Sequence, residues 1–418
     1  MSKTIDIKKV DSNFINQENK EDLYYIDPKV NDSVKIYGLY WFEKDKRYHR
    51  LSKELDEILP KLEGSVDVLA GNSTGGMVAF YSNTNILKIK VKLSFKFHMG
   101  HMPYTGQAGF DLYLGNTYQD MKFYRTSNFD FNKSEYEFTY FNHQDLFKEN
   151  KLFVLNFPLY ATVEEVLIGI NPISDILPCS NLFKDDSKIV FYGTSITQGG
   201  CASRPGMSYT QILSRMLGIE CLNYGFSGNG KGHIEIAEAL STIKNVKLFV
   251  LDYEANVTFE RLKATLDNFV KCIRTKYPIV PIIIISKIPM YLEFHDDNYV
   301  INEKKIRSYQ RNYVRKSKDE NLFYIDGAKV LGKTNIFVNP SFSEGLPTTV
   351  LEAGVMECAV VATPVGGTTE IISSDEIGYT CGLKPEEIQE QIEKLIINKE
   401  EQIKLGKNIK QKVVDQFS

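Results

Sequence analysis

The stretch from Ile189 to Gly199, which reads Ile-Val-Phe-Tyr-Gly-Thr-Ser-Ile-Thr-Gln-Gly, constrains the fold more than any other part of this chain. Its first residues are apolar and predict a short buried strand that Gly193 ends. Ser195 then follows at the carboxyl end of that strand, where open α/β sheets bind ligands. A serine at this place lies close to backbone N–H groups that can stabilise an oxyanion. An ordinary turn or capping serine is the alternative.

The segments on either side of this stretch predict a parallel sheet. Strands are expected at 188–192, 219–224, 248–252, 279–286 and 322–326, and amphipathic helices near 207–217, 232–243, 258–276 and 301–317. Apolar strands that alternate with helices are typical of a parallel sheet covered on both faces. We therefore expect a flavodoxin-like three-layer α/β/α domain over residues 188–332.

The preceding part of the chain shows a different pattern, with many short β-type runs and little helix. Strands are expected at 34–40, 66–69, 77–81, 87–97, 110–114, 135–141, 152–158 and 165–170. In 87–97 apolar and polar residues alternate, which predicts a half-buried strand. We expect a jelly-roll-like β-sandwich over 31–173, between a polar arm (1–30) and a linker (174–187). Whether such a domain binds carbohydrate or only shapes the rim of the active site stays open.

Four short blocks resemble the motifs of one enzyme family. Gly193–Thr197 resembles the first block of the SGNH (GDSL-like) hydrolases, Asn223–Gly230 resembles the second, and Asp252–Asn256 lies where the third is expected. Upstream, Gly109–Tyr113 looks like the Gly-x-Asp-Leu-Tyr signature of a β-domain that precedes one branch of these esterases. The resemblance implies a serine esterase that needs no cofactor and no metal.

The same resemblance assigns roles to three residues. It implies that Ser195 is the nucleophile and that the oxyanion is held by the N–H groups of Ser195 and Gly228 and by the side chain of Asn256. Without Ser195, the alternatives of a turn glycine at 228 and a strand-end cap at 256 would be favoured. We expect a small-molecule or glycan ester as the substrate, such as an O-acetylated carbohydrate.

The catalytic base is the part of the pattern that this sequence departs from. SGNH hydrolases carry a late Asp-x-x-His block, whereas this chain reaches Asp326 and continues into unrelated sequence with no histidine after His295. Loss of the base in a serine hydrolase leaves a residual rate of roughly 10³ to 10⁴ over water, so impaired activity is expected. His233 and His295 are the possible substitute bases, although a surface histidine is the simpler interpretation of each.

Residues 333–418 have yet another character. The sequence predicts strands at 335–340 and 359–365. It also predicts a helix that follows the turn 341–347 and ends at Val355, and two further helices at 385–398 and 400–416. Glu344 and Glu352 match the Glu-x7-Glu pair in the donor-side end of GT-B retaining glycosyltransferases, which this tail resembles. The resemblance implies a Rossmann-like fragment in which these glutamates lie near a nucleotide sugar. The alternative is a helix N-terminus enriched in acid, with Glu352 on a solvated face.

We therefore interpret the chain as a fusion of an SGNH esterase, cut before its last block, with the end of a glycosyltransferase. Three functions follow as hypotheses: an ester hydrolase, a non-catalytic glycan-binding or relic protein, and a nucleotide-sugar-binding protein.

The net charge of -3 gives no case for binding of nucleic acid, and the apolar run 279–285 is too short for a membrane span. The first 20 residues lack an apolar signal segment, which favours the cytoplasm. The oligomeric state stays open.

Overall fold

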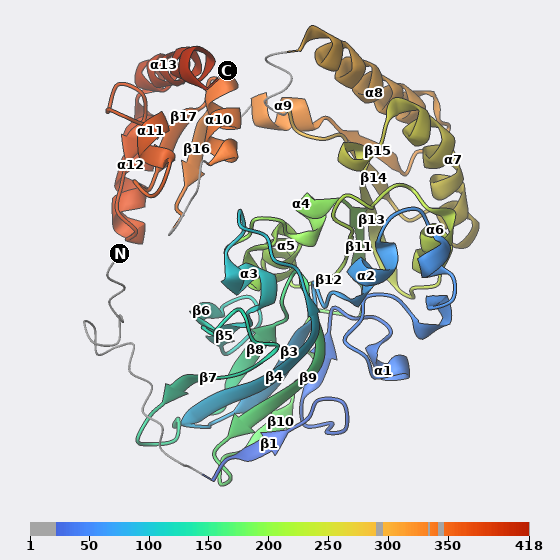
Figure 1. Ribbon diagram of the computed structural model, residues 1–418, viewed down its shortest axis with the longest axis vertical. Coiled ribbons are helices and arrows are strands. Elements are labelled where there is room, and N and C mark those ends of the chain that lie inside the picture. The colour runs from blue at the N-terminus through green and yellow to red at the C-terminus, as the bar shows by residue number, and fades with distance from the viewer. Residues whose placement is uncertain (1–21, 290–295, 333–334, 342–346, 418) are drawn as a thin grey trace. The chain divides into compact units, whose positions relative to one another are not determined.

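The computed structural model describes residues 22–289, 296–332, 335–341 and 347–417. The chain forms two compact units, Met1–Asn229 with Thr242–Lys247 and Gly230–Ser241 with Leu248–Ser418 (Figure 1). The sheets of its N-terminal part are antiparallel and the later ones are parallel, which confirms the expected mixed α/β class.

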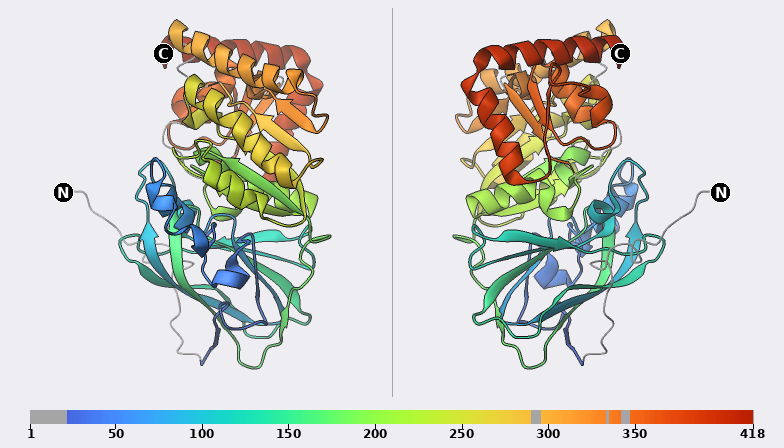
Figure 2. Two further views of the ribbon diagram at one scale, coloured as in Figure 1. Left: turned by 90° about the vertical axis from the view of Figure 1, so that its right-hand side faces the viewer. Right: turned by 90° about the vertical axis from the view of Figure 1, so that its left-hand side faces the viewer.

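Two antiparallel sheets make up the N-terminal β-domain. The first has the order β1 (Tyr24–Ile26), β9 (Ala161–Ile170), β4 (Ile86–Lys96), β7 (Glu135–Asn142). The second has the order β10 (Ile176–Pro178), β3 (Met77–Ser82), β8 (Lys151–Asn156), β5 (Asp111–Gly115), β6 (Lys122–Thr126), and β2 (Lys35–Tyr37) pairs with β3. Figure 2 shows these strands grouped together in both of its views.

The core of this domain lies between the two sheets. Strand β4 points Ile89 and Val91 into it and leaves the lysines that alternate with them partly exposed, as the sequence pattern predicts. Phe80 and Phe153, on the second sheet, stack in the same buried cluster with ring centroids 5.1 Å apart. The two sheets therefore share one apolar core, and the jelly-roll connectivity stays a prediction.

The structure corrects several expectations for the β-domain. Residues 66–69 do not form a strand but belong to helix α2 (Val66–Gly71). Val66, Leu69 and Ala70 are buried there, which is the i, i+3, i+4 spacing of one helix face, and a short apolar run does not distinguish this from a strand. Helix α3 (Tyr104–Ala108) and strand β6 were not expected. Strands β1 and β10 lie within the segments expected as arm and linker.

The first unit also contains the start of the parallel sheet. It holds β11 (Lys188–Gly193), α4 (Ser195–Gln198), α5 (Tyr209–Leu217) and β12 (Glu220–Gly225). Strands β11 and β12 pair in parallel, with Gly193 opposite Gly225 at their carboxyl ends. Both strands are almost entirely buried, as expected for a sheet covered on both faces.

The second unit contains three further parallel strands. Its elements are β13 (Val246–Asp252, whose first two residues belong to the first unit), β14 (Ile282–Ile285), β15 (Leu322–Ile325), α6 (Ile234–Ser241), α7 (Phe259–Lys276), α8 (Asp297–Lys316) and α9 (Gly327–Gly332). Strand β14 pairs in parallel with both β13 and β15. The hydroxyl of Thr258 caps α7 by accepting a hydrogen bond from the N–H of Arg261.

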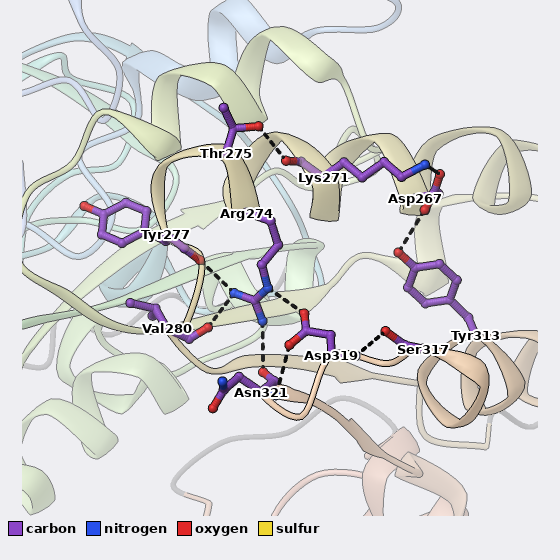
Figure 3. A network of polar contacts seen from close by, with 10 residues as sticks. All are labelled: Asp267, Lys271, Arg274, Thr275, Tyr277, Val280, Tyr313, Ser317, Asp319 and Asn321. Carbon is purple, nitrogen blue, oxygen red and sulfur yellow. Dashed lines mark hydrogen bonds and ion pairs between the residues drawn. The ribbon is translucent and has the colours of Figure 1, made fainter.

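Arg274 ties the end of α7 to the sheet (Figure 3). Its Nε lies 2.5 Å from a carboxylate oxygen of Asp319. Its other nitrogens donate to the carbonyls of Tyr277, Val280 and Asn321. One side chain thus satisfies four acceptors in the connections that lead to β14 and β15.

The C-terminal segment forms its own small parallel sheet. Its elements are β16 (Ile336–Asn339), β17 (Ala359–Ala362), β18 (Tyr379–Thr380), α10 (Thr348–Val355), α11 (Thr368–Ile371), α12 (Pro385–Ile397) and α13 (Lys399–Gln416). All of β17 is buried, and α10 and α13 pack together against it (Figure 1). This arrangement fits the Rossmann-like fragment that the sequence predicts.

Candidate active site

Ser195 is the first residue of α4, at the turn where β11 passes into that helix, as the sequence predicts. The hydroxyl of Thr194 accepts a hydrogen bond from the N–H of Ile196 at 3.3 Å and caps the short helix. Gly199, with a φ of 100°, ends that helix, and its N–H donates to the carbonyl of Ser195 at 3.0 Å. Ser195 is half-buried, so the turn presents it at the carboxyl edge of the strand pair.

Gly228 lies on the loop that follows β12. The loop begins where the N–H of Phe226 donates to the carbonyl of Gly193 at 2.9 Å, and Asn229 closes it by donating to the carbonyl of Ser227 at 2.7 Å. Gly228 itself is exposed and has a φ of 67°, a left-handed conformation that favours glycine. The loop therefore keeps a backbone segment open to solvent next to the strand that precedes Ser195.

Side chains and close backbone contact fix the two loops to one another. The side-chain oxygen of Gln198 accepts a hydrogen bond from the N–H of Ser227 at 2.9 Å. A Cβ at Gly225 would lie 2.1 Å from the backbone nitrogen of Gln198, so only glycine allows this approach. The structure thus brings the Ser195 turn and the Gly228 loop onto neighbouring strand ends of one unit.

The Gly-x-Asp-Leu-Tyr motif of the β-domain holds the chain that follows the Ser195 helix. The carboxylate of Asp111 is fully buried and accepts hydrogen bonds from the N–H of Gly206 and from the side chain of Asn156, both at 2.8 Å. Arg204 lies 3.5 Å from the same carboxylate. Burial raises the pKa of Asp111, and these donors oppose that shift. The motif therefore has a structural task beside the site.

Arg50 is a further residue of this site, and no motif in the sequence pointed to it. Only 1% of it is exposed. Its guanidinium donates to four backbone carbonyls, those of Leu69, Asn72, Asn223 and Gly225. It also lies over the ring of Phe226, 4.6 Å from the centroid. The β-domain thus reaches the end of β12 with a buried cation.

Asn256 belongs to the second unit. It ends the 3₁₀ turn Glu254–Asn256 directly after β13, and its N–H donates to the carbonyl of Tyr253 at 3.2 Å. Its side chain is half-buried. The place at the carboxyl end of a strand agrees with the motif, and its role as an oxyanion donor stays a prediction.

A buried polar cluster surrounds the same turn, and sequence analysis did not find it. Glu254 is 1% exposed and accepts a hydrogen bond from the N–H of Lys287 at 3.1 Å. Burial, and then the neighbouring carboxylate of Glu303, raise the pKa of Glu254 to about 8. The ammonium of Lys287 lies 2.8 Å from Glu303 and donates to the hydroxyl of Tyr299. The cluster anchors the 254–256 turn to the end of β14.

Of the two possible substitute bases, the structure describes His233 but not His295. His233 is only 5% exposed, which corrects the expectation of a surface residue. It lies one residue before α6, and its carbonyl accepts a hydrogen bond from Ala237, a buried residue on the face of that helix. His295 lies outside the described residues.

The glutamate pair of the C-terminal segment is described only in part. Glu344 lies outside the described residues. Glu352 is half-buried on α10, and burial raises its pKa to about 7. Glu352 is thus less exposed than the solvated-face alternative expects, and its role stays a prediction.

Two further properties bear on ligands and membranes. Within the described ranges, three or more His, Cys, Asp or Glu side chains nowhere gather as a set of metal ligands. Of the helices in the part of the chain that the structure covers, none has both the length and the apolar character of a membrane span.

Family models match three consecutive parts of the chain. Residues 23–176 match the N-terminus of SGNH-hydrolase-type esterases, and residues 186–340 match the GDSL-like lipase/acylhydrolase family. Residues 322–412 match the glycosyl transferases of group 1. The two esterase models follow one another in the order that the sequence motifs predict, and the third overlaps the end of the second.

Solved structures resemble about three quarters of this chain. A GDSL-like lipase from Bacteroides ovatus ATCC 8483 is 28% identical, with a TM-score of 0.66, over 74% of this chain and 88% of that one. The salicylyl-acyltransferase SsfX3 from a tetracycline biosynthetic pathway is 16% identical, with a TM-score of 0.56, over 74% and 86%, and it shares the fold. Among curated proteins, none matches the chain significantly.

Proposed function

We propose that this chain, which joins the two parts of a GDSL-like SGNH hydrolase to a segment of the group 1 glycosyltransferase type, hydrolyses carboxylic esters with Ser195 as the nucleophile. One observation carries the proposal. Ser195 and the Gly228 loop follow two paired strands, and Gln198 joins the Ser195 helix to that loop. Acyl transfer needs a serine hydroxyl beside preorganised N–H donors, and the shared strand ends and the Gln198 bond support this arrangement for Ser195 and Gly228.

The reaction would proceed in two steps. The Ser195 oxygen attacks the ester carbonyl carbon and passes its proton to a base, and the alcohol leaves with a proton as the acyl-enzyme forms. Water then attacks the acyl-enzyme, releases the carboxylic acid and returns the proton to Ser195. In both steps the N–H groups of Ser195 and Gly228 and the side chain of Asn256 would hold the oxyanion.

The base decides how fast this reaction runs. Because no histidine follows His295, the family's usual base is missing and we expect a low rate. His233 and His295 are the candidates for a substitute. Replacement of His233 by alanine should lower the remaining rate if His233 takes the proton, and should leave it unchanged if it does not.

For the substrate we propose an O-acetylated carbohydrate. The supporting observation is an aromatic surface on the β-domain, because Tyr104 is 46% exposed and stacks on Phe131 with ring centroids 3.9 Å apart. The neighbouring Thr105 donates its hydroxyl proton to the carbonyl of Ser203, in the loop after the Ser195 helix. An exposed ring beside this loop offers an apolar face on which a sugar ring can stack.

The experiment that tests the proposal is hydrolysis of p-nitrophenyl acetate by the wild type and by Ser195→Ala. We expect a wild-type rate above the uncatalysed one and the loss of this excess in the variant. Ser203→Ala, which removes an exposed hydroxyl eight residues further along, is the matched control and should behave as the wild type. Equal rates for wild type and Ser195→Ala would favour the alternative of a non-catalytic glycan-binding or relic protein.

A second candidate function concerns the C-terminal segment. Its match to the group 1 glycosyltransferases and the half-buried carboxyl of Glu352 favour residual binding of a nucleotide sugar. Glu352→Gln should then weaken the binding of a nucleoside diphosphate in calorimetry. Absence of any heat of binding in the wild type would remove this candidate.

A further inference from the structure

Arg50 is an unusual residue for a buried position. Within the described residues its guanidinium contacts carbonyl oxygens and an aromatic ring, and none of these partners is a carboxylate. Burial lowers the pKa of Arg50 to about 9, so the side chain still carries its charge at neutral pH. The β-domain therefore holds a buried cation whose partners, in the part of the chain that the structure describes, are carbonyl dipoles and an aromatic ring.

Burial of a cation lowers the stability of the folded protein unless other interactions compensate for it. Taking a charge out of water costs free energy, and carbonyl dipoles offset part of this cost without a counter-charge. An apolar side chain of similar length would avoid the desolvation cost of a charge, but it would leave four buried carbonyls without this donor. Arg50 therefore stabilises the backbone that it contacts, and an effect on catalysis has to be measured separately from an effect on stability.

The position of the cation suggests a task. Two of its carbonyl partners, those of Asn223 and Gly225, lie at the end of β12, and Gly225 is three residues before Gly228. Phe226, whose ring Arg50 covers, is hydrogen-bonded through its N–H to Gly193. The guanidinium thus holds, through hydrogen bonds, the backbone between β12 and the loop that carries the proposed oxyanion donor, Gly228.

A second connection reaches the same loop through Asn72. The carbonyl of Asn72 accepts from Nε of Arg50 at 3.0 Å, and its side-chain oxygen accepts from Gln198 at 3.0 Å. Gln198 in turn accepts from the N–H of Ser227 at 2.9 Å. Arg50 therefore acts on the loop directly through Gly225 and indirectly through this chain of side chains.

We propose that Arg50 is a positioning residue for acyl transfer, which fixes the course of residues 225–228. The β-domain then contributes a residue that positions the active-site loop. The kinetic part of this inference rests on the proposed esterase function, whereas the effect on the loop does not.

The kinetic test compares Arg50→Met, which keeps the apolar stem, with Arg50→Lys, which keeps the charge. With p-nitrophenyl acetate we expect Arg50→Met to lower kcat per folded molecule at least about tenfold while KM changes less than about twofold, because an oxyanion forms only in the transition state. Arg50→Lys should recover only part of kcat, because an ammonium can donate to at most three of the four carbonyls. Arg47→Met is the matched control, because Arg47 pairs with Asp56 near the surface. A lower melting temperature with unchanged kcat would overturn the proposal.

Amide hydrogen exchange tests the loop without any need for turnover. In Arg50→Met, the rate of amide exchange in residues 223–229 should rise at least about tenfold while strand β4 keeps its protection. The reason is that the variant lacks the hydrogen bonds of Arg50, so these bonds no longer have to break before the loop can open. An equal rise throughout the unit, or none in the loop, would overturn the proposal. If Arg50→Met does not fold, Arg50→Lys decides: a rise confined to the loop supports the inference and unchanged exchange contradicts it. A wild type that hydrolyses no ester would count against the proposed function alone.

Discussion

The side-chain oxygen of Gln198 accepts a hydrogen bond from the backbone N–H of Ser227 at 2.9 Å, and this bond joins two residues that are 29 positions apart in the chain. The amide nitrogen of Gln198 donates to Asn72 and to the carbonyl of Leu159, both at 3.0 Å. Gln198 is fully buried, so a satisfied amide of this kind has little freedom to move. The Ser195 helix and the Gly228 loop are therefore held by one side chain that the β-domain also contacts.

Asp111 should be among the most important residues for the stability of the first unit. Its replacement by alanine leaves the N–H of Gly206 and the amide of Asn156 without their buried acceptor. We expect the free energy of unfolding to fall by about 2 to 4 kcal/mol, measured by urea denaturation. Asp145→Ala, on an exposed loop, is the control and should change it by less than about 0.5 kcal/mol. Equal effects of the two substitutions would show that the buried bonds contribute little.

Arg274 and Lys271 are both basic residues on α7, yet their removal should have different consequences. Arg274→Ala removes the partner of Asp319 and of three carbonyls, and we expect a loss of about 2 to 4 kcal/mol in the free energy of unfolding. Lys271→Ala breaks an exposed ion pair with Asp267 and should cost at most about 0.5 kcal/mol. Thermal unfolding of both variants, side by side, checks the difference. A Lys271 effect as large as that of Arg274 would contradict this assignment.

Glu254 should make stability depend on pH. Its pKa of about 8 in the folded state lies above its ordinary value, so between about pH 5 and 8 the folded chain keeps a proton that the unfolded chain has lost. The groups that face it are Glu303, Lys287 and Arg307. Stability from this group is therefore full at low pH and is lost as pH rises through 8. We expect the free energy of unfolding to fall by at least about 1.4 kcal/mol over this interval.

Substitution by glutamine isolates this effect. Glu254→Gln keeps an oxygen that can accept from the N–H of Lys287 and cannot titrate, so most of the decline with pH should disappear. Glu260→Gln, an exposed position on α7, should keep the wild-type profile. Chemical denaturation at pH 5, 6.5 and 8 gives the measurement. A decline of the same size in Glu254→Gln would place its origin in another group.

The parallel strands were predictable because their sequence is locally consistent. The apolar residues of β11 are bounded by Gly193 and followed by the Ser195 turn, and the strand and the turn both lie where the pattern predicts. Helix α2 was missed because Val66, Leu69 and Ala70 fit a strand as well as one helix face over so few residues. Short apolar runs are decided by tertiary packing, which a local pattern does not contain.

The site was predictable only where a motif marks it. Ser195 and Gly228 stand in recognisable blocks, and Asp111 in a third, whereas nothing near Arg50 distinguishes it from a surface arginine. Its importance comes from carbonyls that lie up to 175 residues away in the chain. The burial of His233 escaped prediction for the same reason, since it depends on the packing of α6 rather than on neighbouring residues.

The most direct test of the central claim, that Ser195 is the nucleophile, is covalent labelling with a fluorophosphonate followed by peptide mass spectrometry. The wild type should carry one adduct, on the peptide that contains Ser195, and Ser195→Ala should carry none. Labelling of the variant at the wild-type rate, an adduct on another residue, or a wild type that takes up no label would contradict the claim.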